Sequence, residues 1–190
     1  MASVIDICNR ALQKLGAERI TSLTQNSVSA RACNLAYEHV RDAELRSHTW
    51  NFSIKRAGLA ADADVPAYGF DHKYTLPSDC LRLLPNDYQE GAYSSDWKVE
   101  GRKILTNDDA PLNIRYISRI TDTTQYDALF IEALACKMAM EMCEELTQSN
   151  SKRELAYKEY INTMRDARRM NAFENNPAEQ QTDGWVTARI

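Results

Sequence analysis

The chain has 190 residues, of which 44% are hydrophobic, and a formal net charge of −4. This length and composition predict a single domain with a sizeable buried core. The sequence has no apolar run near the roughly 18 residues of a membrane span, and residues 1–6 lack a basic and apolar leader, so we expect a protein made in the cytoplasm. The negative charge disfavours a protein that holds nucleic acid by its phosphates, although it leaves room for DNA as passing cargo.

The first predicted element is an amphipathic helix from Val4 to Leu15. Ser3 and Asp6 have the spacing of a capping box, in which each side chain accepts a hydrogen bond from the backbone N–H of the other residue. Gly16 follows the last apolar residue of the helix, a position where glycine is typical of a helix C-terminus.

A second amphipathic helix is predicted from a cap at Asn26 or Ser27 to about Ser47. Its apolar positions repeat at helical spacing and are expected to face the core: Val28, Ala32, Leu35, Ala36, Val40 and Ala43. Its charged positions are expected to face outward: Arg31, Glu38, Arg41 and Asp42. The two helices would then form a hairpin, with Ile20 and Leu23 of the connecting loop packed over its open end.

Residues 67–122 change to short alternating segments separated by turn residues, which predicts a small antiparallel β-meander. The predicted strands are Tyr74–Leu76, Cys80–Leu84, Trp97–Glu100, Lys103–Thr106 and Leu112–Ile117. The segment from Trp97 to Thr106 is expected to be a hairpin with Gly101 in its turn. Residues 57–65 connect the helices to the meander and are rich in small residues, so we expect a flexible loop there.

Two further helices are predicted after the meander. The third begins near Thr123 or Thr124, where Thr124 and Asp127 have capping-box spacing, and residues 128–142 are apolar on almost every side, which predicts the central helix. The fourth opens at Ser151 and extends to about residue 170, with a strongly charged outer surface. Its inward positions are expected to be Leu155, Tyr157, Ile161, Met164 and Ala167.

The C-terminal residues differ from the rest of the chain. Residues 171–184 are polar and aperiodic and hold too little apolar area to offset the entropy of ordering, so we expect them to be mobile in the free monomer. They continue into Trp185, Val186 and Ile190, an apolar anchor suited to docking on another chain.

The fold class predicted from these elements is mainly α: a four-helix bundle-like domain with an inserted small antiparallel β-meander and an extended C-terminal tail. The predicted parts of this one structural domain are residues 1–66, 67–122, 123–170 and 171–190. A sheet this small is expected to depend on the helices for its stability.

The sequence carries no motif that points to catalysis, to a cofactor or to a metal. It lacks phosphate-binding glycine loops and a nucleophile elbow, and its three histidines have no metal-ligand spacing. The odd number of cysteines and the absence of a C-x-x-C pair favour reduced core thiols over a disulfide or metal framework. These cysteines are Cys8, Cys33, Cys80, Cys136 and Cys143. We therefore predict no catalytic residue, no metal ligand and no cofactor.

Two surface features have both a structural and a functional interpretation. Arg165, Arg168 and Arg169 share one face of the fourth helix, and the acidic residues beside them favour a solvated or subunit-facing surface over contact with nucleic acid. Trp50 and Phe52 would suit a ligand platform, but packing of the helix exit onto the core is the favoured interpretation.

The stretch from residue 15 to residue 60 is the most informative part of the sequence. A helix that stops at Leu15-Gly16, a loop closing on Ile20-Thr21-Ser22-Leu23, a second helix and an exit at Thr49-Trp50-Asn51-Phe52 resemble the tail tubular protein A family. Those proteins are the head-to-tail adaptors of short-tailed bacteriophages, the podoviruses. The predicted meander departs from the family in length and detail, so the resemblance is carried by the helical hairpin and its exit.

The resemblance implies a structural virion protein without catalysis. Proteins of this family form dodecameric rings that lie between the portal and the tail nozzle and leave a channel for genome passage. The implied partners are therefore the portal protein, the tail nozzle protein and further copies of the chain, with genomic DNA only as passing cargo and no membrane. The implied location is the head–tail interface of the virion.

The expected contacts can be assigned to residues. Trp50, Asn51 and Phe52 would be a structural packing motif, and the tail from Asn171 to Ile190 would bind the portal. Within that tail, the predicted portal-binding residues are Trp185, Val186 and Ile190. The charge expected along the hairpin predicts a nozzle-facing surface made of Trp97, Lys98, Glu100, Arg102 and Lys103.

Two other functions are compatible with the same sequence. One is a small cytoplasmic ligand-binding protein or enzyme, which would need a pocket with converging polar groups between the sheet and the helices. The other is a soluble regulatory module that binds one host protein through the same tail. Electron microscopy of the protein with and without the portal would distinguish all three.

Overall fold

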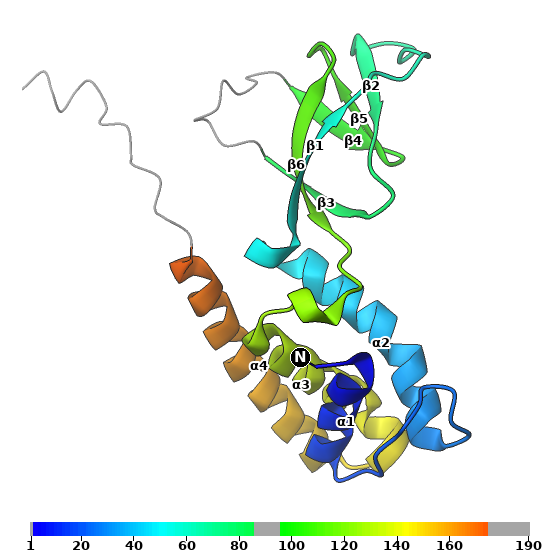
Figure 1. The fold of residues 1–190 in the computed structure, drawn as a ribbon, viewed down its shortest axis with the longest axis vertical. Coiled ribbons are helices and arrows are strands. Elements are labelled where there is room, and N and C mark those ends of the chain that lie inside the picture. Colours follow the sequence, from blue (N-terminus) through cyan, green and yellow to red (C-terminus); the bar gives the residue numbers. More distant parts are fainter. Residues whose placement is uncertain (1, 86–95, 175–190) are drawn as a thin grey trace, which may run out of the picture.

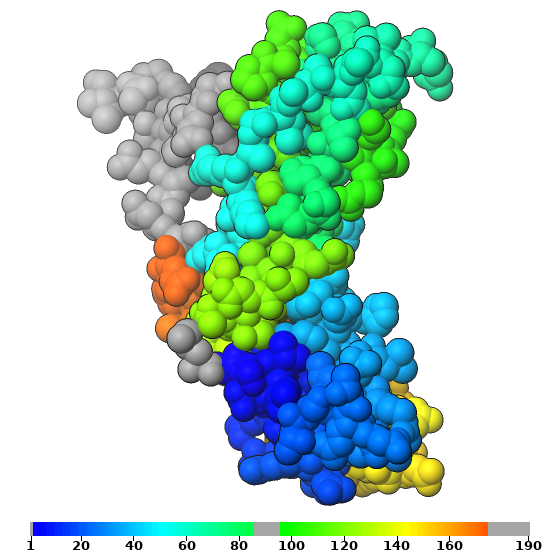
Figure 2. All heavy atoms as spheres, turned by 45° about the vertical axis from the view of Figure 1, so that its right-hand side comes forward, coloured from blue at the N-terminus to red at the C-terminus, as the bar shows by residue number. Residues whose placement is uncertain are grey.

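The computed structural model describes residues 2–85 and 96–174, and in this part of the chain four α-helices lie at one end of an elongated molecule and two three-stranded antiparallel sheets at the other (Figure 1). The helical elements are α1 (Val4–Leu15), α2 (Val28–Ser47), the 3-10 helices η1 (Asn51–Ser53) and η2 (Thr123–Gln125), α3 (Ala128–Thr147) and α4 (Asn150–Phe173). The strands are β1 (Ile54–Leu59), β2 (His72–Thr75), β3 (Cys80–Leu84), β4 (Trp97–Glu100), β5 (Lys103–Thr106) and β6 (Leu112–Ser118). The space-filling view shows the same two ends (Figure 2).

The ends of the first two helices are as the sequence predicts. The hydroxyl of Ser3 accepts a hydrogen bond from the backbone N–H of Asp6, whose carboxylate accepts from the N–H of Ser3 at 2.8 Å, and together these bonds complete the capping box. Gly16 ends α1 with a φ of 67°, a left-handed conformation that glycine adopts without strain. Ser27 caps α2 by accepting a hydrogen bond from the N–H of Ala30.

The two later helices begin at other caps than the predicted ones. Residues 123–125 form η2, and Asp127 caps α3 by accepting hydrogen bonds from two backbone N–H groups. Ser149, rather than Ser151, caps α4. Several neighbouring residues in each stretch carry a side chain able to cap, so spacing alone does not select among them.

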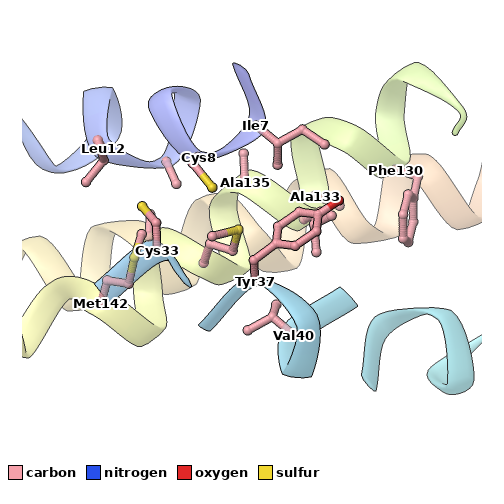
Figure 3. Packing of buried hydrophobic residues seen from close by; sticks show 14 of the residues in the cluster. Ile7, Cys8, Leu12, Cys33, Tyr37, Val40, Phe130, Ala133, Ala135 and Met142 are labelled. Atoms are coloured by element: carbon pink, nitrogen blue, oxygen red, sulfur yellow. The ribbon is translucent and has the colours of Figure 1, made fainter. Parts of the chain in front are cut away.

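Helix α3 is the centre of the helical part, as its almost uniformly apolar surface predicts. Each of α1, α2 and α4 packs mainly against it, whereas α1 and α2 touch one another over a short stretch only. The two helices of the expected hairpin therefore pack mainly on α3 and only slightly on each other. Where α1 and α2 do touch, Cys8 of α1 and Cys33 of α2 direct their sulfur atoms toward each other (Figure 3). All five cysteines are free and buried, as predicted.

The loop between α1 and α2 is fixed by one side chain. The amide of Asn9 accepts a hydrogen bond from the N–H of Ile20 at 2.8 Å and donates one to the C=O of the same residue at 2.9 Å. Ile20 is buried and Leu23 is half-buried against the helical core, which confirms the expected packing of this loop.

The predicted inward face of α2 is partly wrong. Leu35, expected in the core, is 72% exposed, and Val28 is 50% exposed. Arg41, expected outside, is buried because its guanidinium pairs with Asp42 and lies over the ring of Tyr37. A charged side chain can occupy an inward position when a partner neutralises it there.

The predicted inward face of α4 is also partly wrong. Met164 and Ala167 are buried as expected, but Leu155, Tyr157 and Ile161 are exposed. The buried residues of α4 are mostly small, which lets this helix lie close to α3. The larger apolar side chains therefore fall on the flanks and outer side of the helix.

The β part consists of two packed sheets rather than one meander. Strand β1 lies partly in residues 57–65, where a loop is expected, and pairs with β6 to give the order β1-β6-β3. The second sheet has the order β2-β5-β4. Tyr74, Ile104 and Tyr116 are among the side chains buried in a second hydrophobic core that the strands enclose. The described chain is therefore a mixed α and β protein with one core at each end.

Candidate functional site

The junction between the helices and the sheets is built around Trp50. This side chain is 1% exposed, and its indole N–H donates a hydrogen bond to the C=O of Glu44 at 3.0 Å. The ring of Phe130 meets it edge-on with 5.0 Å between centroids, and Phe52 stacks at 6.1 Å. Because Trp50 has no accessible face for a ligand, the packing interpretation of this residue holds.

Asn51 connects the same junction to the end of α4. Its backbone N–H donates to the side-chain oxygen of Asn171 at 2.9 Å, and its side-chain amide donates to the backbone C=O of Asn171 at 2.8 Å. The side-chain amide of Asn171 donates in turn to the C=O of Thr49 at 2.9 Å. We call these three hydrogen bonds the Asn51–Asn171 clamp. The role of Asn171 has no signal in the sequence, since a single asparagine near a helix end is common.

A buried carboxylate lies beside this junction. Glu44 is 4% exposed, and one of its oxygens accepts a hydrogen bond from the hydroxyl of Tyr160 at 2.9 Å. Its other oxygen has no hydrogen-bond partner in the described part of the chain. Burial raises the pKa of Glu44, and this effect is opposed by the hydrogen bond from Tyr160 and by the charges of Lys137 and Arg168. The periodicity of apolar residues cannot reveal such a group.

The hairpin of β4 and β5 is confirmed, with its turn at Gly101 and Arg102. Both turn residues have positive φ, 52° and 64°, a geometry that matches the twist of the paired strands. Every residue of β4 is exposed, so Trp97, Lys98 and Glu100 are accessible as predicted. The ammonium of Lys98 lies 6.0 Å from the ring centroid of Phe70.

Two residues of the predicted nozzle-facing set also make contacts within the chain. The guanidinium of Arg102 donates a hydrogen bond to the C=O of Pro77 at 2.7 Å, which ties the hairpin turn to the segment before β3. Lys103 is half-buried and pairs with Asp62 at 2.5 Å. Arg102 stays exposed despite its contact with Pro77, so the accessible part of the predicted set is Trp97, Lys98, Glu100 and Arg102.

Among the hollows formed by the described residues, three shallow ones bear on ligand binding. One of about 580 Å³ lies on the outer side of the β2-β5-β4 sheet and is lined by Phe70, by residues of the hairpin and by Lys73, which pairs with Asp64. A second of about 600 Å³ surrounds residues 65–71 next to it. The third, of about 230 Å³, lies beside Phe52, Tyr126 and the end of α4.

Within residues 2–85 and 96–174, no group of three or more His, Cys, Asp or Glu side chains is placed to hold a metal ion. In the same part of the chain, no helix combines the length and apolarity that crossing a membrane requires.

The basic cluster of α4 is exposed on the outer side of that helix. Arg165 approaches Asp166 at 3.8 Å, and the guanidinium of Arg169 lies 5.7 Å from the ring centroid of Phe173. Arg168 has no ion pair in the described part of the chain. The predicted portal-binding residues, Trp185, Val186 and Ile190, lie outside the described residues.

No known family model matches the chain, and no curated protein matches it. The observations that bear on function are therefore the sequence resemblance and the exposed surfaces of the helices and the hairpin.

Proposed function

We propose that the protein is a structural head-to-tail adaptor of the tail tubular protein A type. In this role copies of the chain form a ring, dodecameric in that family, between the portal and the tail nozzle of a short-tailed bacteriophage. The genome passes through the channel of the ring, and the protein belongs to the tail of the virion. The proposal assigns no catalytic residue and no cofactor to the chain.

The observation that carries this proposal is the position of the Thr49–Phe52 motif. These residues join the end of α2, the start of β1 and the last turn of α4, which the Asn51–Asn171 clamp holds to them. A protein that binds one partner through its hairpin and another through its tail needs a stiff connection between the two. The buried ring of Trp50 and the clamp supply such a connection.

Exposed apolar side chains support contact with further copies of the chain. Leu35 lies exposed on α2, and Tyr157 and Ile161 lie exposed on α4. These two helices pack on α3, with little contact to each other, and present separate outer surfaces (Figure 1). Two different surfaces on one subunit suit the head-to-tail contacts from which rings are built.

Electron microscopy with the portal tests the proposal directly. We expect purified protein to be a monomer or a weak oligomer, because the charged surfaces of its helices favour contacts that hold only when many act together. Rings should appear when portal-bearing particles are added, and analytical ultracentrifugation should show no stable ring without them. If no ring forms on a portal from the same phage, the adaptor assignment is wrong.

A small ligand-binding protein is the second candidate, and the hollow of about 580 Å³ is the observation in its favour. This hollow lies on the outer side of a sheet rather than between sheet and helices. Of its three lysines, Lys73 and Lys103 are already paired with Asp64 and Asp62, and Lys98 lies near the ring of Phe70. A thermal-shift screen of small anions and metabolites distinguishes the two candidates, because only the ligand-binding protein should gain stability from one of them.

A further inference from the structure

Two of the five buried cysteines face each other in the helical core. Cys8 lies in the middle of α1 and Cys33 in the second turn of α2, and both are 0% exposed. Figure 3 shows their sulfur atoms directed toward each other across the short contact between these helices. The two thiols share a hydrogen bond, in which Cys8 is the donor and Cys33 the acceptor. We call these two residues the Cys8–Cys33 thiol pair.

The other three cysteines are not placed in this way. Cys136 and Cys143 lie seven residues apart on α3, which separates them by about 10 Å along the helix axis. A disulfide bond needs Cα atoms within about 7 Å of each other, so these two residues cannot be bridged. Cys80 lies in the second core, which the strands enclose. The position of Cys8 and Cys33 is therefore the one that suits a disulfide bond.

The packing around the thiol pair allows the two sulfur atoms to join. Ala11 and Ala30 lie three residues from Cys8 and Cys33 and are also fully buried, so they share the inner sides of α1 and α2. Their small side chains leave room for the slight approach that a bond of about 2 Å requires. Because α1 packs mainly on α3, it can shift relative to α2 without breaking a large contact between the two helices.

We infer that the Cys8–Cys33 thiol pair is a site of covalent modification, at which the two residues form an intramolecular disulfide bond when the protein meets a small disulfide oxidant. The bond would join α1 directly to α2. In the reduced protein these helices are connected mainly through α3. The disulfide would also close a chemical loop around residues 8–33, which contains the whole connection between the two helices.

The reaction consists of two thiol–disulfide exchanges. The hydrogen bond from Cys8 lowers the pKa of the Cys33 thiol, although burial opposes this effect, and the same hydrogen bond together with burial raises the pKa of Cys8. Cys33 is therefore the attacking thiol. Its thiolate attacks one sulfur atom of the oxidant, the S–S bond of the oxidant breaks, and one small thiol leaves with the proton of Cys33.

The second exchange completes the bond. The sulfur atom of Cys8 attacks the Cys33 sulfur of the mixed disulfide, and the second small thiol leaves with the proton of Cys8. The two cysteines together lose two electrons and two protons, and the oxidant is reduced to two thiols.

Access to the thiol pair requires a local opening of the fold. Both sulfur atoms are buried, so the oxidant reaches them only when α1, a helix of 12 residues, separates from the core. Oxidation should therefore be slow in the folded protein and faster in urea below the unfolding transition. Once formed, the disulfide keeps α1 attached to α2 and restricts the unfolded chain, which stabilises the folded state.

The timing of this reaction rests on the proposed function, whereas its chemistry does not. A phage adaptor is made in a reducing cytoplasm and acts in a virion outside the host, where disulfide bonds persist. In that role the disulfide would form after assembly and stabilise the finished particle.

The test uses full-length protein incubated with hydroxyethyl disulfide and then alkylated. We expect the intact mass to show the loss of two hydrogen atoms and alkylation of Cys80, Cys136 and Cys143 alone. Peptide mapping should find the peptides of Cys8 and Cys33 joined. The oxidised protein should have a Tm higher by about 10 °C, and a reductant should remove this increase.

Single substitutions make the result specific. Neither Cys8→Ala nor Cys33→Ala should form an internal disulfide or gain Tm on oxidation. Cys136→Ala is the matched control, because it removes an equally buried thiol and should still form the disulfide with the same increase in Tm. Circular dichroism checks that each variant keeps its helices.

Two outcomes would overturn the inference. One is alkylation of all five cysteines after oxidation, both in buffer and in urea below the unfolding transition. The other is a disulfide bond that joins other cysteines or two copies of the chain. Ring formation at the portal is measured with the reduced protein, so failure of the adaptor proposal and failure of this inference are distinguishable.

Discussion

Asn171→Ala removes the side-chain half of the Asn51–Asn171 clamp. The substitution deletes two hydrogen bonds, one from the N–H of Asn51 and one to the C=O of Thr49, each 2.9 Å long. It leaves these two backbone groups without their protein partner at a half-buried site. The third bond of the clamp survives, because it ends on the backbone C=O of residue 171.

The expected magnitude follows from these contacts. Each hydrogen bond contributes about 1 kcal/mol to the free energy of unfolding, so the two lost bonds destabilise the protein by about 2 kcal/mol. Alanine favours a helix over asparagine by about 0.5 kcal/mol, which leaves a net loss of about 1.5 kcal/mol. Asn162→Ala is the matched control, because Asn162 lies exposed on the same helix and makes the same propensity gain without losing a bond.

Urea unfolding followed by circular dichroism measures the difference. With a denaturant dependence of about 2 kcal/mol/M, Asn171→Ala should unfold at a urea concentration lower by roughly 0.7 M. Asn162→Ala should unfold at or slightly above the concentration for the unmodified protein. Equal unfolding midpoints for the two variants would show that the clamp adds nothing to the free energy of unfolding. The stability of the junction would then come from the packing of Trp50.

Three further predictions concern Glu44, the hairpin and the tail. Burial raises the pKa of the Glu44 carboxyl, so the ionised carboxylate destabilises the folded state above that pKa, and this destabilisation disappears as the pH falls. Glu44→Gln should therefore raise Tm at about pH 7 and remove this part of the pH dependence of stability. Lys98→Glu with Glu100→Lys should leave Tm almost unchanged, since both side chains are exposed, but reduce binding of the nozzle protein in a pull-down. Removal of residues 184–190 should leave Tm nearly unchanged and abolish co-sedimentation with portal-bearing particles. Nozzle binding by the hairpin variant at the level of the unmodified protein would contradict the nozzle-facing assignment. Particle occupancy by the truncated protein at that level would contradict the portal-binding assignment.

Features set by neighbouring residues could be predicted from the sequence. The capping box of Ser3 and Asp6, the left-handed Gly16 and the turn at Gly101 each depend on a few adjacent residues, and all three are found where expected. The apolar surface of α3 likewise predicts its central position, because a helix without a polar face has to be buried on most sides.

Strand β1 could not be predicted, because its partner lies far away in the sequence. Residues 54–59 do not alternate between apolar and polar residues, so they lack the usual signal of a strand. Their hydrogen bonds come from β6, which pairs Ile54 with Ile117 and Leu59 with Leu112. The division into two sheets follows from this pairing. It cannot be predicted from residues 67–122 alone, because β1 lies outside them.

The candidate site was predicted only in part, for a related reason. Trp50 and Phe52 are conspicuous aromatic residues, and the sequence favours their packing onto the core. Glu44 and Arg41 face inward because of Tyr160 and Asp42, and an apolar stripe drawn through α2 assigns charged residues to the outside by default. Burial of a charge is decided by its partner in space, which the sequence of one helix does not show.

The distribution of buried and exposed side chains on α4 is partly the reverse of the one that its sequence predicts. Its buried residues are Ala156, Met164 and Ala167, two of them small, while the larger Tyr157 and Ile161 are exposed. A helix whose stability came only from its own domain would place its largest apolar side chains inward. The reversed distribution on α4 fits the proposal that a neighbouring subunit contacts the exposed side of this helix. The apolar spacing of α4 therefore predicts Tyr157 and Ile161 in the core, whereas the packed side of the helix is formed mainly by smaller residues that allow a close approach to α3.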